Sequence, residues 1–201
     1  MTFNDTCPHK QALVGYRLSA PASWAALPLE GESGWVDEVI ALLAPRPETR
    51  ATLRQDLQLV HRALNSEQHL GIGAWMPFPE TGSVLGAMAV DLMIPNEGSG
   101  KAVDIDEYRE LLATVKRQGV RVISREIFRD TVNAGPCLTA RETVMMDRRV
   151  VEYHVVYSVF PLDSCDAIEL TFCTPHLELA AALDTDSRLI ADSLTLSTGE
   201  R

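Results

Sequence analysis

The sequence has little positive charge. Its 201 residues include 18 lysines and arginines against 28 aspartates and glutamates, which gives a formal net charge of -10 at pH 7. Proteins bind nucleic acids mainly through lysine and arginine, which release counterions from the phosphates. We therefore expect no nucleic acid and no anionic membrane surface as a partner, whereas a neutral or basic protein partner agrees with the composition.

Long apolar segments are also missing. The longest, residues 84–94, is interrupted by Asp91 and is about half as long as a membrane-spanning helix needs. Residues 1–11 contain charged side chains and no continuous apolar core, so no secretory signal is visible. We expect a cytoplasmic protein.

Cysteine pairs and phosphate-binding loops are absent as well. Cys7 and His9 are close together, but no second close pair would complete a tetrahedral metal site. Gly71 and Gly73 lie in a strand-like segment without the GK[ST] sequence of a phosphate-binding loop. We predict no metal and no cofactor, and reduced thiols at all four cysteines: Cys7, Cys137, Cys165 and Cys173.

The apolar periodicity predicts the order strand, helix, helix, two strands, helix, four strands, helix. Helical spacing covers residues 35–43, 48–65 and 105–118 and the segment that follows Thr174 and Pro175. Asp104 and Glu107 are placed as the cap of the third helix. Alternating or continuous apolar patterns cover residues 14–18, 69–78, 83–94, 120–131, 137–146, 149–161 and 167–174.

The segment 149–161 is the most strongly patterned part of the chain. One of its faces is wholly apolar or aromatic and the other is mixed, which is typical of an inner strand covered on both sides. Four consecutive strands favour a mostly antiparallel sheet. With 46% hydrophobic residues, the chain can form one core. We predict a polar leader at 1–12, a single α+β domain at 13–196 and a tail at 197–201.

Two segments resemble a known family. Residues 16–21 (YRLSAP) are followed by Trp24, and residues 168–175 (IELTFCTP) lead to residues 190–194 (IADSL). Together they resemble the PsbP-like α/β/α sandwich, a fold shared with a Ran-binding transport factor and small bacterial proteins. The resemblance implies an α+β fold in which helices flank about six to seven strands. It also implies a binding or assembly protein without catalysis.

The chain departs from the common bacterial form of this family. It shows no export or lipid-attachment signal, and it places two helices between its first and second predicted strands. Both departures leave the function open.

Two cysteines could each form a catalytic pair with a histidine. Cys173 with His176, or Cys165 with His154, would give a nucleophile and a base. A cysteine needs a base in contact to be a strong nucleophile, and spacing in sequence does not establish contact. A strand cysteine is typically a small hydrophobic residue, so we predict no catalytic residue.

Two surfaces are candidates for binding. Trp75, Met76 and Phe78 lie beside prolines and could form an apolar partner-binding patch. A row of arginines could bind an anion or an acidic partner, although a solvated strand face also explains it; the row is Arg121, Arg125 and Arg129.

The leading hypothesis is a non-enzymatic cytoplasmic protein-binding domain of adaptor, chaperone or regulator type. Its protein partner is unknown, and a homo-oligomer is left open. The first alternative is a small-molecule-binding protein or enzyme with a pocket between sheet and helices, drawing polar groups from His154, Tyr157 and Arg141. The second alternative is an acidic immunity or antagonist protein that meets a basic toxin.

Overall fold

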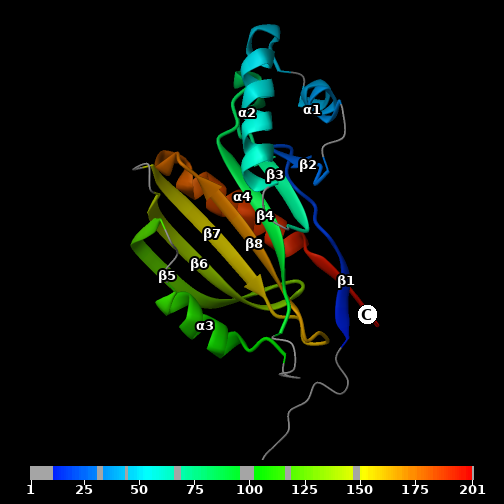
Figure 1. The fold of residues 1–201 in the computed structure, drawn as a ribbon, viewed down its shortest axis with the longest axis vertical. Coiled ribbons are helices and arrows are strands. Elements are labelled where there is room, and N and C mark those ends of the chain that lie inside the picture. Colours follow the sequence, from blue (N-terminus) through cyan, green and yellow to red (C-terminus); the bar gives the residue numbers. More distant parts are fainter. Residues whose placement is uncertain are drawn as a thin grey trace, which may run out of the picture.

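The computed structural model describes residues 11–30, 34–43, 45–65, 69–95, 102–115, 119–146 and 150–200. Within these residues the main element is a seven-stranded antiparallel sheet of order β2-β3-β4-β8-β7-β6-β5 (Figure 1). The predicted α+β fold with a mostly antiparallel sheet is confirmed. The strands, in spatial order, are β2 (Trp24–Leu27), β3 (Gly71–Trp75), β4 (Gly86–Met93), β8 (Ala167–Thr174), β7 (Val151–Val159), β6 (Gly135–Met146) and β5 (Val120–Val132).

A second sheet joins the two ends of the described chain. β1 (Ala12–Arg17) pairs antiparallel with β9 (Thr195–Gly199). The sequence prediction ended the chain on a helix and placed residues 197–201 in a tail, whereas residues 197–199 belong to β9. This strand is short and mostly polar, so its sequence has no detectable periodicity. It forms through its pairing with β1.

Strand β2 was also missed by the sequence prediction. No strand was predicted between residues 18 and 35. The Pro21 carbonyl accepts a hydrogen bond from the Trp24 amide at 3.0 Å, so the chain turns there and enters the main sheet. β2 then pairs with β3 along its whole length, and β3 becomes an inner strand.

One face of the main sheet is covered by α4 (Ala180–Ser193). Its side chains Leu183 and Ile190 are fully buried against Tyr157 and Phe172 of the sheet. This is the wholly apolar face predicted for β7, and its burial supplies the largest apolar core.

The opposite face carries two separate groups of helices. α3 (Ile105–Thr114) packs over the part of this face that contains Leu138 and Phe160. The carboxylate of Asp104 accepts hydrogen bonds from the backbone amides of Asp106 and Glu107 at 2.8 and 2.9 Å, so the predicted cap is confirmed.

The second group is the helix-pair lobe, which we define as α1 (Trp35–Leu43) and α2 (Arg50–Leu64). Leu53 and Leu57 of α2 are fully buried in a core of their own with Ile72 and Ala74 of β3. Figure 1 shows this lobe extending past one end of the sheet, with α3 near the opposite end. In the part of the chain that is described, no helix combines the length and apolar character needed to cross a membrane.

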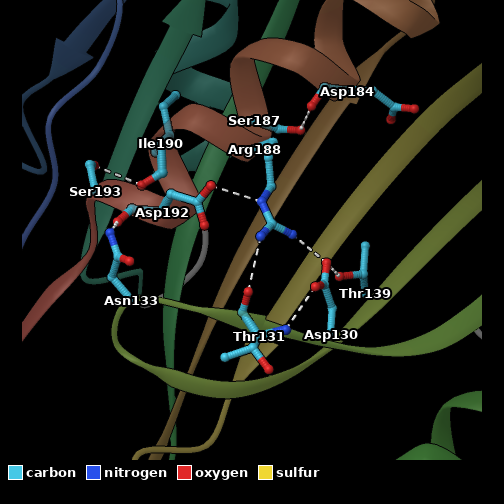
Figure 2. Close-up of polar contacts among 10 residues, drawn as sticks. All are labelled: Asp130, Thr131, Asn133, Thr139, Asp184, Ser187, Arg188, Ile190, Asp192 and Ser193. Atoms are coloured by element: carbon cyan, nitrogen blue, oxygen red, sulfur yellow. Dashed lines mark hydrogen bonds and ion pairs between the residues drawn. The ribbon is translucent and has the colours of Figure 1, made fainter.

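Arg188 ties α4 to the β5–β6 hairpin (Figure 2). Its Nε donates to Asp192 at 2.9 Å, one Nη donates to the carbonyl of Thr131 at 3.0 Å, and the other Nη pairs with Asp130. Asn133 donates to the Asp192 carbonyl from the same hairpin. These contacts fix the position of α4 across the sheet.

Candidate functional site

A row of polar side chains crosses the sheet face opposite α4. Arg125 of β5 lies opposite Glu142 of β6, Glu142 lies opposite His154 of β7, and His154 lies opposite Cys173 of β8. Directly opposed residues project to the same side of a sheet, so these four share one face. Glu152 precedes His154 by two positions and therefore projects to that face as well.

Three members of this row lie close enough to act together, and we name them the Glu152–His154–Cys173 cluster. One carboxylate oxygen, one imidazole nitrogen and the thiol sulfur all lie within 4.8 Å of one another. Glu152 Oε2 is 2.9 Å from His154 Nε2. The second ring nitrogen, Nδ1, is buried and has no hydrogen-bond partner.

The chemistry of Cys173 does not favour nucleophilic catalysis. Although part of the residue is exposed, its thiol is surrounded by protein. This burial, with a further contribution from the Glu152 carboxylate, raises the pKa of Cys173 to about 12. The thiol is therefore protonated at neutral pH, and a protonated thiol is a poor nucleophile.

The structure does not bring together the two cysteine–histidine pairs that the sequence suggested. Cys173 lies beside His154 instead of His176, whose Nδ1 faces Glu178 at 3.4 Å. Cys165 lies in the turn that follows β7, whereas His154 is near the start of that strand. Sequence spacing missed the real pair because contact between neighbouring strands depends on register.

The polar groups suggested for a ligand pocket lie on opposite faces. His154 belongs to the polar row, whereas Arg141 pairs with Val155 and shares the α4 side with Tyr157. Tyr157 is 2% exposed, and the Arg141 guanidinium lies 5.2 Å from the centre of the Phe128 ring. These three residues therefore do not line one pocket.

The apolar patch expected at the β3 turn is mostly interior. Trp75 and Met76 are 0% exposed and only Phe78 is at the surface, at 46%. Trp75 stacks on Trp24 of β2 at a ring distance of 6.1 Å. Strand β2, which was not foreseen, pairs with β3 and places Trp24 directly opposite Trp75. In this chain only Phe78 of the three is free to contact a partner.

The expected arginine row is broken by a β-bulge. The β5–β6 register shifts between Val122 and Ser124, and one extra residue moves the residues before it to the other face. Arg121 thus projects away from Arg125 and Arg129. Arg125 forms an ion pair with Glu142 at 2.5 Å, and Arg129 pairs with Asp106. The three arginines do not form a common anion site.

The helix-pair lobe presents apolar side chains to solvent. Leu42, near the end of α1, is 82% exposed and Leu59 of α2 is 57% exposed. Three exposed arginines lie on α2, one of which, Arg54, pairs with Asp37 of α1; they are Arg50, Arg54 and Arg62. Asp37, Glu38 and Asp56 balance these arginines, so the lobe combines exposed leucines with charges of both signs, and the positive charges lie on α2.

Two shallow hollows lie between the helices of the lobe. The larger has a volume of about 430 Å³ and includes Asp37, Arg50 and Arg54 in its lining. The other has a volume of about 320 Å³ and lies beside Trp35 and His61, whose rings are 4.9 Å apart. The groove between α1 and α2 thus offers both apolar and charged contacts.

No protein-family model matches the sequence, and no curated protein matches it either. Among solved structures, the chain is similar to LpqN of Mycobacterium tuberculosis, described as involved in cell envelope biogenesis. The TM-score is 0.51 at 10% sequence identity, and the match covers 90% of this chain and 83% of LpqN. At this identity the likeness shows a shared fold alone.

Proposed function

We propose that the chain is a non-enzymatic protein-binding domain and that the helix-pair lobe is its contact surface. The observation that carries the proposal is the exposure of Leu42 and Leu59 on a lobe that extends past the sheet (Figure 1). Contiguous apolar patches rimmed by polar residues are typical of protein contact sites, and we propose that Leu42 and Leu59 belong to one. The resemblance of two sequence segments to the PsbP-like family, whose members are mostly binding or assembly proteins, favours the same class of function.

The chemistry of the lobe selects the kind of partner. Arg50, Arg54 and Arg62 against Asp56 give α2 itself an excess of positive charge, although α1 adds Asp37 and Glu38 and the net charge of the chain is -10. Charge at the contact, more than net charge, determines which partner docks. We propose a partner segment that is acidic and carries spaced apolar side chains, such as an amphipathic helix whose apolar side chains contact Leu42 and Leu59.

Site-specific photocrosslinking in native cells tests this proposal. A photoreactive residue at position 42 or 59 should give a discrete adduct of the same mass from both positions. Leu162 and Leu189 are matched controls, because they are 73% and 56% exposed but lie outside the lobe. Arg62→Glu should weaken the adduct formed from position 59, because it reverses a charge that the acidic segment would meet.

The outcomes separate the alternatives. Equal adducts from all four positions, or none from the lobe, would contradict the proposal. An adduct with the mass of two copies of the 22.1 kDa chain would indicate a homo-oligomer in place of a separate partner. Fractionation of the same cells tests the cytoplasmic location that we expect from the sequence.

A further inference from the structure

We infer that the Glu152–His154–Cys173 cluster binds a divalent transition-metal ion, with Zn²⁺ as the best chemical match. Thiolate sulfur, imidazole nitrogen and carboxylate oxygen are the three side-chain ligands that Zn²⁺ takes in proteins. The mixture of soft sulfur and nitrogen with one oxygen disfavours Ca²⁺ and Mg²⁺, which prefer oxygen ligands alone.

The strand register places the ligands where such an ion needs them. His154 and Cys173 are directly opposed on neighbouring antiparallel strands, and Glu152 is the next residue of the same face. Their ligand atoms are within 4.8 Å of one another. Tetrahedral Zn²⁺ bonds require a sulfur-to-nitrogen separation of about 3.6 Å, which side-chain rotation can reach from a separation of at most 4.8 Å while the strands stay in place.

His154 has a nitrogen to offer. Its ring contacts Glu152 through Nε2, while Nδ1 is buried without a hydrogen-bond partner. A buried polar nitrogen without a partner is costly, and coordination through Nδ1 satisfies it while Nε2 keeps its contact with Glu152. This imidazole is therefore the second observation, besides the clustering, that points to a bound ion.

The local charges fit a cation. Binding of the ion displaces the proton of the Cys173 thiol to solvent, and the resulting thiolate together with the Glu152 carboxylate balances the two positive charges of Zn²⁺. The nearest fixed cation in the polar row is Arg125, and it is already engaged by Glu142 at 2.5 Å. Opposite Cys173 on β4 lies Ala87, whose small side chain leaves room beside the sulfur.

Three protein ligands leave one coordination position for water or an exogenous ligand. Structural zinc sites are usually closed by four protein ligands, whereas open sites keep an exchangeable position. We therefore infer an exchangeable metal site and not a structural one. The site lies on β7 and β8 and not on α1 or α2. A test of the metal site is therefore independent of a test of the partner surface proposed for the lobe.

Cobalt substitution provides the test. Co²⁺ should bind the reduced, chelator-treated full-length chain at one ion per chain and produce a thiolate-to-cobalt charge-transfer band, which Zn²⁺ should abolish by displacement. Cys173→Ser should remove the band, and His154→Gln should lower the affinity more than tenfold. The matched controls Cys137→Ser and Cys7→Ser should keep the band. Cys7 lies outside the described residues, but it is close to His9 in sequence and must be tested.

A measurement on the unmutated protein keeps the test decisive if a variant fails to fold. X-ray absorption at the zinc edge should report one sulfur among the ligands of the bound ion. The inference is overturned if the wild type shows no thiolate band, if the band survives Cys173→Ser, or if the absorption spectrum contains no sulfur ligand.

Discussion

Removal of one carboxylate on α4 should destabilise the protein strongly. Asp186 accepts a hydrogen bond from Trp75 Nε1 at 2.9 Å and another from Ser23 Oγ at 2.6 Å. It thereby joins α4 to β3 and to the turn before β2. Trp75 is 0% exposed, so Asp186→Ala leaves its indole N–H inside the protein without this acceptor.

The magnitude follows from these two contacts. A hydrogen bond to a charged group contributes about 1.5–3 kcal/mol, and an unsatisfied buried donor costs about 1–3 kcal/mol. Ser23 is partly exposed and can bind water in the variant, so its loss is the smaller part. We expect a total loss of about 3 kcal/mol in the free energy of unfolding, which lowers the Tm of a chain of this size by roughly 6–12 °C.

Urea and thermal unfolding followed by circular dichroism provide the assay, with two matched variants. Asp186→Asn keeps an acceptor oxygen but loses the charge, so it should cost about half as much as the alanine variant. Thr185→Ala removes an exposed side chain that bonds only within α4, and it should change stability by less than about 0.5 kcal/mol. If Asp186→Ala were as stable as Thr185→Ala, the carboxylate would not hold α4 against β3 and the reasoning would be refuted.

Two further predictions use glycine and tyrosine. Gly86→Ala should lower the free energy of unfolding, measured in urea, by about 2 kcal/mol or more, because the added Cβ would lie 2.6 Å from the Cys173 carbonyl oxygen. The control Gly15→Ala should be close to neutral, because its added Cβ has no neighbouring atom nearer than 3.9 Å. Equal stabilities of the two variants would show that the strands do not approach so closely at Gly86. Burial is the main cause that raises the pKa of all four tyrosines above the ordinary value. The folded state therefore favours the neutral phenol, and this contribution to the free energy of unfolding is complete below about pH 10 and is lost as the pH rises further. Tyrosinate absorbance should therefore increase together with loss of the folded circular dichroism signal, and a tyrosine that ionises near pH 10 in the folded protein would contradict the burial of Tyr16, Tyr108, Tyr153 and Tyr157.

Much of the fold could be predicted because its longer elements carry strong periodicity. The alternation in β7 separates a wholly apolar face from a mixed one, and the structure places α4 on the apolar one. Likewise, the leucines of α2 repeat at helical spacing and are buried. β2 and β9 could not be predicted, since each has only a few residues and exists through pairing with a distant strand.

The candidate site depends on register, which is harder to predict than strand identity. His154 and Cys173 were both singled out, yet each was matched with another residue. Their contact requires the exact length of the turn between β7 and β8, and a slip of one residue would move one of them to the opposite face. The prediction that the three arginines share one face was wrong for a related reason. The bulge in β5 cannot be recognised in the alternating pattern of residues 120–131.

The two sides of the sheet differ in what their residues can do. On the α4 side, polar groups such as Asp130 and Arg188 are paired with each other (Figure 2), so they serve to position the helix. On the other side, α2 and α3 cover different parts of the face, and the polar row crosses β7 and β8. Glu142 within that row is engaged by Arg125, which leaves the imidazole of His154 beside an acid and a thiol. A cluster with this composition contributes little to a hydrophobic core, and metal coordination is the role that uses all three of its side chains.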